Sequence, residues 1–171
     1  TVSTPDIEAN KNRTAICLIK TDGTGRIQLT QGKESQVEPA FIDEGERIAY
    51  LQGGNLWTMK CDGTDKKQLS QGEDIEGYKF SPDGKQLLVT GTGEAFDNIG
   101  LNILPGQQSN HYDYQLFLYD LATQKAQALT KEFNPCVMSA VWSRADGKIY
   151  LQTEDEDYQR LYGCDPKSGK M

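Results

Sequence analysis

The feature that most constrains this chain is an internal repeat. The segment AICLIKTDGTGRIQLTQG, from Ala15 to Gly32, aligns without a gap on NLWTMKCDGTDKKQLSQG, from Asn55 to Gly72, after a shift of 40 residues. A third copy runs from Gln115 to Thr130, and a fourth begins at Arg160. A repeat period of roughly 20 to 50 residues is typical of architectures that stack one small unit several times. A single architecture should therefore account for the whole chain.

A second unit alternates with the first and has the pattern of a tight hairpin. Its copies run from Glu38 to Gln52, from Gly77 to Gly91 and from Ser139 to Thr153. In each copy an aromatic residue precedes a turn that contains glycine, and glycine supplies the positive φ that tight hairpins need. Each period thus contains two hairpins, or four short strands, which we call strands a to d in chain order.

These patterns predict an all-β fold, namely a partial β-propeller of about three and a half four-stranded antiparallel blades. In the third period we expect strand a near Tyr78–Phe80, strand b near Gln86–Thr90, strand c near Gln115–Asp120 and strand d near Ala126–Leu129. The alternative is a flat β-sandwich with coincidental turns, which the gapless repetition disfavours.

The phase of the repeat predicts where each blade begins and ends. We expect a partial blade at 1–36, blades at 37–70 and 71–130, and a partial blade at 131–171. At the start, Thr1–Thr4 resembles the end of a strand b, followed by a polar connection over Pro5–Arg13 and then strand c from Ala15. Both ends then fall inside blades, so we expect the chain to belong to a larger protein. Open sheet edges also predict self-association, because unpaired edges pair with other strands.

Charge and composition argue against several classes of function. The net charge is −7 and basic residues are scattered singly, so we expect no nucleic-acid partner. No apolar run approaches the roughly 20 residues of a membrane-spanning helix, and the first residues lack the regions of a signal peptide. The four cysteines form no CxxC pair and His111 is the single histidine, so we expect no metal and no cofactor. No GxSxG motif occurs, so we expect no catalytic residue in this chain.

Three segments carry a resemblance to a known family: SPDGKQLLVTG from Ser81, LYDLATQKAQALT from Leu118 and WSRADGKIYLQTEDEDYQRLYGCDPKSGK from Trp142. They resemble the propeller repeat that TolB-type proteins share with the N-terminal domains of prolyl oligopeptidase family serine peptidases. The last segment, an acidic hairpin before a Leu-Tyr strand, is especially similar to blades of dipeptidyl and acylaminoacyl peptidases. The resemblance covers nearly the whole chain.

The resemblance implies a noncatalytic part of a serine exopeptidase or oligopeptidase. In that family a C-terminal α/β-hydrolase domain, which this sequence does not contain, carries the Ser, Asp and His triad, and the propeller acts as scaffold and gate for peptide substrates. The resemblance further implies a periplasmic or otherwise exported bacterial protein. The alternative is a TolB-like propeller that binds a protein or peptide without chemistry. A site in the central channel has little support, because no cluster of His and carboxylates recurs between blades.

An insertion, Glu94–Tyr114, separates strands b and c of the third period, and loops of this length are often functional. Because successive strands reverse direction, the b–c and d–a connections emerge on one face, so we expect the insertion beside Gln71–Gly77. In dipeptidyl peptidases, the family binds the substrate's amino terminus through paired glutamates. Neither acidic connection of this chain, Gln31–Pro39 or Gln71–Gly77, reproduces the aromatic-flanked pair of the family.

The candidate substrate contacts are therefore the acidic residues of these connections and the histidine of the insertion. They are Glu73, Asp74, Glu76, Glu94, Asp97 and His111. Two alternatives remain open, solvated acidic turns and a self-packed loop. The apolar residues between Phe96 and Leu104 could pack on a hydrolase domain or line its cavity.

Overall fold

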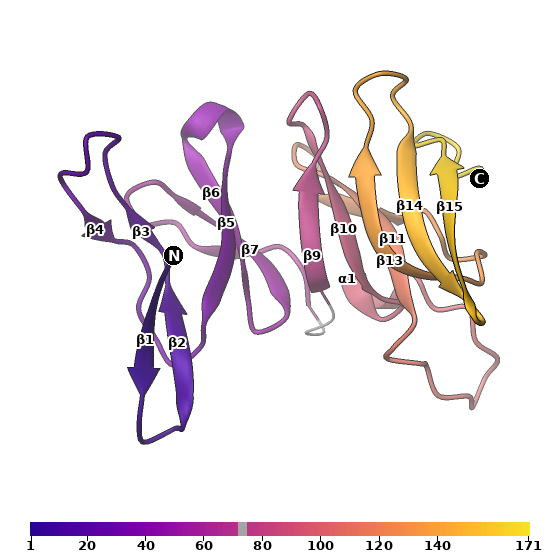
Figure 1. Cartoon of the computed structure of the whole chain (residues 1–171), viewed down its shortest axis with the longest axis horizontal. Coiled ribbons are helices and arrows are strands. Elements are labelled where there is room, and N and C mark those ends of the chain that lie inside the picture. Colours follow the sequence, from indigo (N-terminus) through magenta and orange to yellow (C-terminus); the bar gives the residue numbers. More distant parts are fainter. Residues whose placement is uncertain (72–74) are drawn as a thin grey trace. The chain divides into compact units, whose positions relative to one another are not determined.

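The computed structural model describes residues 1–71 and 75–171. The chain divides into two compact units, Thr1–Glu73 and Asp74–Met171 (Figure 1). Strands form nearly all of the regular structure in both units, which confirms the all-β prediction. Every pairing between the described strands is antiparallel.

The first unit contains one complete four-stranded sheet and two smaller sheets. The complete sheet has the order β5 (Gln36–Ile42), β6 (Arg47–Gln52), β7 (Asn55–Lys60) and β8 (Lys67–Gln68). The two smaller sheets pair β1 (Val2–Asp6) with β2 (Lys11–Ala15) and β3 (Cys17–Leu18) with β4 (Ile27–Gln28).

The second unit contains a four-stranded and a three-stranded sheet. The first has the order β9 (Ile75–Phe80), β10 (Gln86–Thr92), β11 (Tyr114–Asp120) and β12 (Lys125–Ala128). The second has the order β13 (Cys136–Trp142), β14 (Ile149–Asp155) and β15 (Tyr158–Cys164). Strands β9 to β12 coincide with the four strands expected in the third period. A short helix, α1 (Ala95–Asn98), lies in the connection between β10 and β11.

The expected polar connection over Pro5–Arg13 is wrong, because most of it forms the β1–β2 hairpin. The Asp6 carboxylate accepts a hydrogen bond from the Ala9 amide at 3.0 Å and pairs with the Arg13 guanidinium. Asn10 adopts a positive φ of 49°, which asparagine tolerates better than most residues. Local polar contacts and turn chemistry therefore support strands that lack an apolar pattern.

The same hydrogen-bond pair closes strands c and d in three successive repeats. A strand c residue donates its backbone N–H to a hydroxyl just after strand d, and its carbonyl accepts the N–H of the residue before that hydroxyl. The donor and hydroxyl pairs are Ile16 and Thr30, Leu56 and Ser70, and Leu116 and Thr130, each at 2.8 Å. The repeat read from the sequence is thus a repeat of backbone geometry.

The turns that follow strand c are held by an aspartate. Asp22 accepts hydrogen bonds from the Thr24 amide and hydroxyl, and Asp62 does the same for Thr64. These hydrogen bonds lower the pKa of both carboxyls. The glycine after each aspartate has a φ of +82°, a conformation that residues with a Cβ adopt at a cost.

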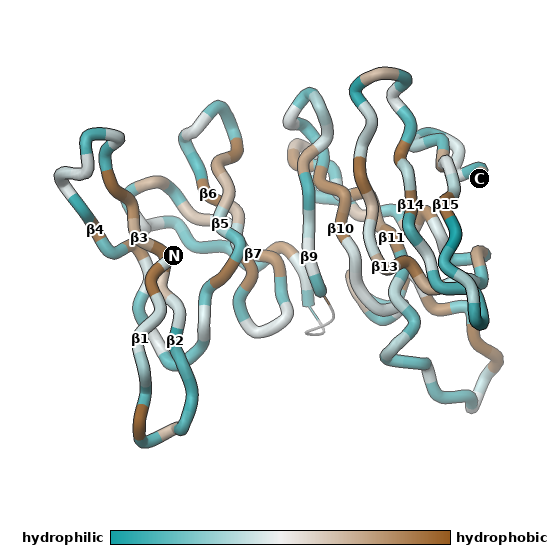
Figure 2. Tube along the Cα trace, in the orientation of Figure 1, coloured by the Kyte–Doolittle hydropathy of each residue, from teal (hydrophilic) through white to brown (hydrophobic). Residues whose placement is uncertain are grey.

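Apolar residues are concentrated in the strands (Figure 2), and the buried ones form a core within each unit. In the second unit, Leu88 and Leu116 of one sheet share a core with Leu151 of the other, so the two sheets pack face to face. In the first unit, Ile16 and Leu29 share a core with Tyr50 of β6. This face-to-face stacking of small sheets is the packing that a propeller requires.

Candidate functional site

In the second unit, the b–c insertion and the d–a connection meet at one end of the sheets. Asn102 of the insertion donates from Nδ2 to the Glu132 carboxylate at 3.0 Å, and Glu132 lies in the connection between β12 and β13. The Tyr114 hydroxyl donates to Glu76 Oε1 at 3.3 Å, which places the end of the insertion against the start of β9. The insertion and the connections between strands d and a therefore lie on the same face of the sheets, as strand direction predicted.

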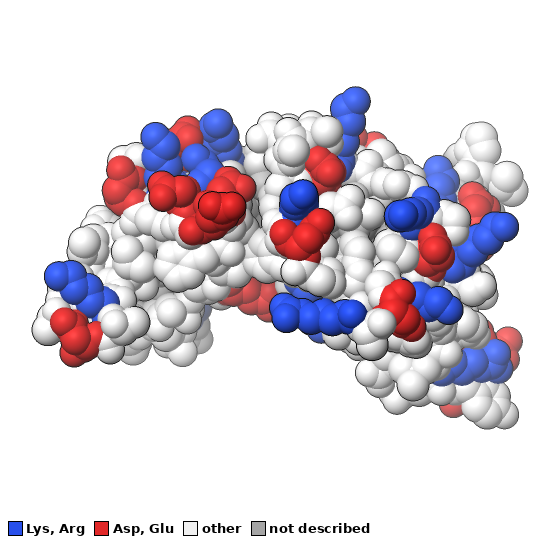
Figure 3. Space-filling view, turned by 90° about the horizontal axis from the view of Figure 1, so that it is seen from above, with Lys and Arg blue, Asp and Glu red and all other residues white. Residues whose placement is uncertain are grey.

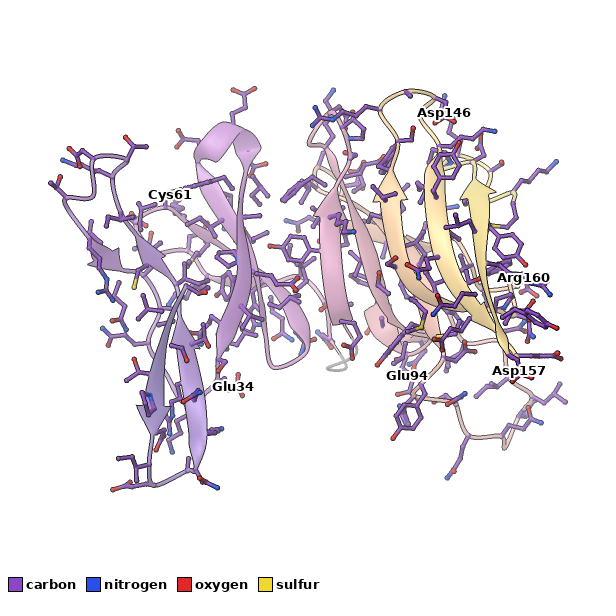
Figure 4. The ribbon with its side chains drawn as sticks, viewed as in Figure 1. Glu34, Cys61, Glu94, Asp146, Asp157 and Arg160 are labelled. Carbon is purple, nitrogen blue, oxygen red and sulfur yellow. The ribbon has the colours of Figure 1, made fainter. Side chains whose placement is uncertain are left out.

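The first unit has the same relationship between its two connections. Gln52, at the end of strand b, donates from Nε2 to the Glu34 carboxylate at 3.1 Å, and Glu34 lies in the d–a connection. Figure 4 labels Glu34 in this unit and Glu94 in the second. Carboxylates thus recur where the b–c and d–a connections approach each other.

Glu94 ties the two ends of the insertion together. Its Oε1 accepts a hydrogen bond from the Ser109 hydroxyl, and its Oε2 lies 3.8 Å from His111 Nδ1. The Ser109 hydroxyl thus donates to a carboxylate, whereas a serine nucleophile would need its hydroxyl hydrogen-bonded to the imidazole. The cluster of Glu94, Ser109 and His111 is suited to hold the insertion together or to contact a ligand.

The remaining predicted site residues are less closely grouped. Glu76 is exposed and accepts a hydrogen bond from the Tyr114 hydroxyl, and Asp97 is exposed on α1. Glu73 and Asp74 lie outside the described residues. Of the six candidates, the structure brings Glu94 and His111 into one cluster.

A cavity that the sequence did not predict lies between the insertion and the β12–β13 connection. Its volume is about 150 Å³. The polar side chains that line it include Asp113, Gln115, Lys131 and Glu132. Burial raises the pKa of the Asp113 carboxyl. Asp113 immediately precedes β11 and Gln115 is the second residue of that strand, so their spacing of two positions is the one signal in the sequence that both could line one cavity.

The apolar residues of the insertion divide into two groups. Phe96 is buried, with its ring centroid 5.6 Å from that of Phe117 and 5.5 Å from that of Tyr119, so it packs on its own blade. Leu104 is 69% exposed and Tyr112 is 84% exposed. The insertion is therefore anchored at one point and presents apolar surface at another.

The opposite end of the sheets carries the hairpin turns and mixed charges. In the view of Figure 3, basic side chains lie beside acidic ones. Arg47 pairs with Asp65 at 2.7 Å, and in the second unit Asp146 lies at the end opposite to Glu94 (Figure 4). The pKa of Asp146 is lowered to about 2, first by the hydroxyl of Tyr150 at 2.7 Å and then by Ser143 and the Lys148 amide.

Within residues 1–71 and 75–171, no three His, Cys, Asp or Glu side chains converge as a metal ion would require. No helix in the described part of the chain has the length and apolarity to cross a membrane. The four cysteines are free thiols, of which Cys164 is buried.

No protein-family model matches the chain. Among curated proteins, dipeptidyl-peptidase 5 of Porphyromonas endodontalis is 43% identical over 94 residues, which is 52% of this chain and 14% of that protein. Among solved structures, the acylaminoacyl peptidase of Pyrococcus horikoshii has a TM-score of 0.64 at 16% identity and covers 96% of this chain and 28% of its own. TolB of Acinetobacter baumannii has a TM-score of 0.61 at 16% identity and covers 91% of this chain and 36% of its own.

The chain is a partial β-propeller homologous to part of dipeptidyl-peptidase 5. The resemblance to propeller repeats of prolyl oligopeptidase family peptidases is confirmed, and so is its extension to TolB. The propeller segment matches about 14% of the length of the curated relative. Its antiparallel four-stranded sheets are blades, and the insertion decorates the blade formed by β9–β12.

Proposed function

We propose that this propeller segment belongs to a longer serine peptidase of the prolyl oligopeptidase family and acts there as scaffold and substrate gate. The observation that carries the proposal is the 43% identity to dipeptidyl-peptidase 5. The segment itself hydrolyses nothing in this proposal, and an α/β-hydrolase domain of the parent chain supplies the Ser, Asp and His groups. The parent is a serine exopeptidase or oligopeptidase exported by a bacterium, as the bacterial source of the relative suggests.

The gate is the end of the blade that carries the insertion. Exposed Leu104 and Tyr112 offer apolar surface to a hydrolase domain or to a peptide. Glu94 and His111 stand at the base of the same insertion. We propose that peptide substrates contact the acidic and histidine side chains predicted from the sequence. These are Glu73, Asp74, Glu76, Glu94, Asp97 and His111.

We also propose that the blade boundaries follow the repeat. The blades are then 1–36, 37–70, 71–130 with the insertion at 94–114, and 131–171. The three repeated pairs of hydrogen bonds support this phase, because each joins strands c and d of one period.

The test uses the full-length gene product. We expect it to contain a GxSxG motif followed by Asp and His, to react with a fluorophosphonate serine probe, and to cleave dipeptidyl or acyl-aminoacyl chromogenic substrates. Glu94→Gln in that protein should raise KM for peptides several-fold with little change in kcat. Glu8→Gln, at the tip of the β1–β2 hairpin, is the matched control. A parent chain with no reactive serine would overturn the peptidase proposal.

The TolB likeness favours a second candidate, a propeller that binds a protein or peptide without chemistry. In that case the full-length protein leaves the serine probe unreacted and recovers one defined partner in a cross-linking experiment. The insertion tip is again the surface to test, and Leu104→Asp should abolish the cross-link.

A further inference from the structure

Strand β15 has an open edge at a position where the complete blades have a fourth strand. In the sheets β5–β8 and β9–β12, strand d pairs with strand c, whereas β15 pairs with β14 alone among the described strands. We propose that this edge is a docking site for one extended strand in which Leu is followed by Ser or Thr. The source of that strand rests on the proposed function, because we assign it to the remainder of the longer parent chain.

Two turns establish which residue of β15 corresponds to which residue of β11. After β15, Asp165 Oδ1 accepts hydrogen bonds from the Ser168 amide at 2.8 Å and from the Ser168 hydroxyl at 3.0 Å. After β11, Asp120 holds a turn of the same kind. Counting back four residues from each aspartate gives Leu161 in β15 and Leu116 in β11. Leu161 therefore occupies the position that strand d clamps in a complete blade.

The backbone groups of Leu161 point to the open edge. The Asp165 N–H donates to the Lys170 carbonyl at 2.9 Å, and the Asp165 carbonyl accepts the Gly169 N–H at 2.8 Å, so both groups point away from β14. Backbone groups of alternate residues in a strand point to the same side, so those of Leu161 also point away from β14. Leu161 is 78% exposed, and a ligand can reach this position.

Each filled edge of the chain is closed by the same two kinds of residue. A leucine after strand d donates its N–H to the strand c carbonyl, and the hydroxyl of the next residue accepts the strand c N–H. The pairs are Leu29 with Thr30, Leu69 with Ser70, and Leu129 with Thr130. The three hydroxyl residues are at most 3% exposed, so protein rather than water satisfies the strand c N–H. A strand with Leu followed by Ser or Thr would satisfy both backbone groups of Leu161.

The docked strand has to come from outside these 171 residues. Leu is followed by Ser or Thr at three places in the sequence, and all three pairs already close a strand c. A second copy of the chain would lose one of its own clamps in supplying the strand, so the exchange gains nothing from this contact. The match to the curated relative covers 14% of that protein, and the proposed parent chain has ample further length to supply the strand.

The test titrates the chain of 171 residues with a blocked peptide that copies Lys125–Lys131, and it follows backbone amide shifts by NMR. We expect saturable shifts along β15. The same peptide with Thr130→Val keeps the shape of the side chain but lacks the hydroxyl acceptor, so it should bind about fivefold more weakly. The peptide with Thr130→Ser retains the hydroxyl and should bind nearly as tightly as the first.

Variants of the chain test the same contact from the side of β15. Leu161→Pro removes the N–H that faces the open edge and leaves the hydrogen bonds to β14 in place, and proline is tolerated on edge strands. In this variant the peptide with Thr should lose its preference over the peptide with Val. Leu161→Ala keeps the N–H, so this matched control should keep the preference. Preserved far-ultraviolet circular dichroism shows that each variant is folded.

Three results would overturn the inference. They are equal binding of the Thr and Val peptides by the unchanged chain, shifts confined to strands other than β15, and an edge closed by a second copy that the peptide does not displace. The full-length gene product should leave the peptide unbound, because its own strand fills the edge, and binding by that protein would overturn the assigned source. None of these results depends on a reactive serine, so they are distinguishable from a failure of the peptidase proposal.

Discussion

The backbone N–H of Leu116 donates to the Thr130 hydroxyl at 2.8 Å, and Thr130 is fully buried. The Leu116 carbonyl accepts the Leu129 N–H at 2.8 Å, so this one residue clamps strands c and d together from both sides. Because the arrangement recurs at Leu56 with Ser70, it is a requirement of the blade rather than of one loop.

Removing this hydroxyl should destabilise the blade. Thr130→Val keeps the shape of the side chain but leaves the Leu116 amide without its acceptor, so we expect a loss of about 1–3 kcal/mol in the free energy of unfolding. Thr130→Ser, which retains the hydroxyl, is the control and should recover most of that loss. Urea denaturation measures both, and equal losses for the two variants would contradict the assignment.

The glycines of the two Asp-Gly-Thr turns should differ in how well they tolerate replacement by alanine. Gly23 and Gly63 share a φ of +82°, so alanine at either costs roughly 1–2 kcal/mol of backbone strain. A Cβ at Gly63 would lie 2.9 Å from the Leu29 carbonyl oxygen, whereas one at Gly23 would meet nothing within 4 Å. We therefore expect Gly63→Ala to lower the unfolding temperature more than Gly23→Ala. A reversed order would show that the close approach to Leu29 has no energetic effect.

Acid should weaken the hairpin turn at Asp146. Its pKa lies at about 2 in the folded chain, below the ordinary value of 3.8, so its contribution to stability is complete above about pH 4 and is lost as the pH falls through 2. Tyr150→Phe removes the largest cause and should move the Asp146 pKa back toward 3.8, as read from carboxyl carbon shifts. An unchanged pKa in this variant would assign the effect to Ser143 and the Lys148 amide.

The contribution of Asp113 to stability should have the opposite pH dependence. Burial raises its pKa in the folded chain, so stability is greatest below the unfolded-state pKa and decreases as the pH rises through the folded-state pKa. Asp113→Asn should then raise the unfolding temperature at pH 7 and have a smaller effect below pH 4. Asp97→Asn serves as the exposed control. An unchanged unfolding temperature in Asp113→Asn at pH 7 would show that burial of this carboxyl has no energetic effect.

The edge of the three-stranded sheet should promote association. Strand β15 pairs with β14 on one side, and its Tyr158 and Leu161 are 63% and 78% exposed. Unpaired strand edges recruit other strands, so we expect sedimentation velocity to show dimers or larger species that grow with concentration. Lys substitution at Leu161 should reduce them, since charge on an edge blocks pairing. A monomer at all concentrations would contradict this prediction.

The repeat, the strand positions and the turn residues of this propeller were predictable from the sequence, because each depends on short-range chemistry. Asp-Gly-Thr closes its own turn at Asp62, and the apolar run within Gln86–Thr92 indicates a strand that is buried on both faces. The β1–β2 hairpin was missed, because its strands are held by the Asp6–Arg13 pair rather than by an apolar pattern. The face shared by the b–c and d–a connections followed from strand direction alone.

Tertiary structure alone decided the contents of the candidate site. The path of the insertion depends on Phe96 packing against Phe117 and Tyr119, and on the tie between Glu94 and Ser109. Neither contact has a local signature, because each joins residues 15 or more positions apart. That path is what brings Asp113 and Gln115 to the cavity beside the β12–β13 connection, so the sequence determined the blade and the packing of the insertion determined which residues line the cavity.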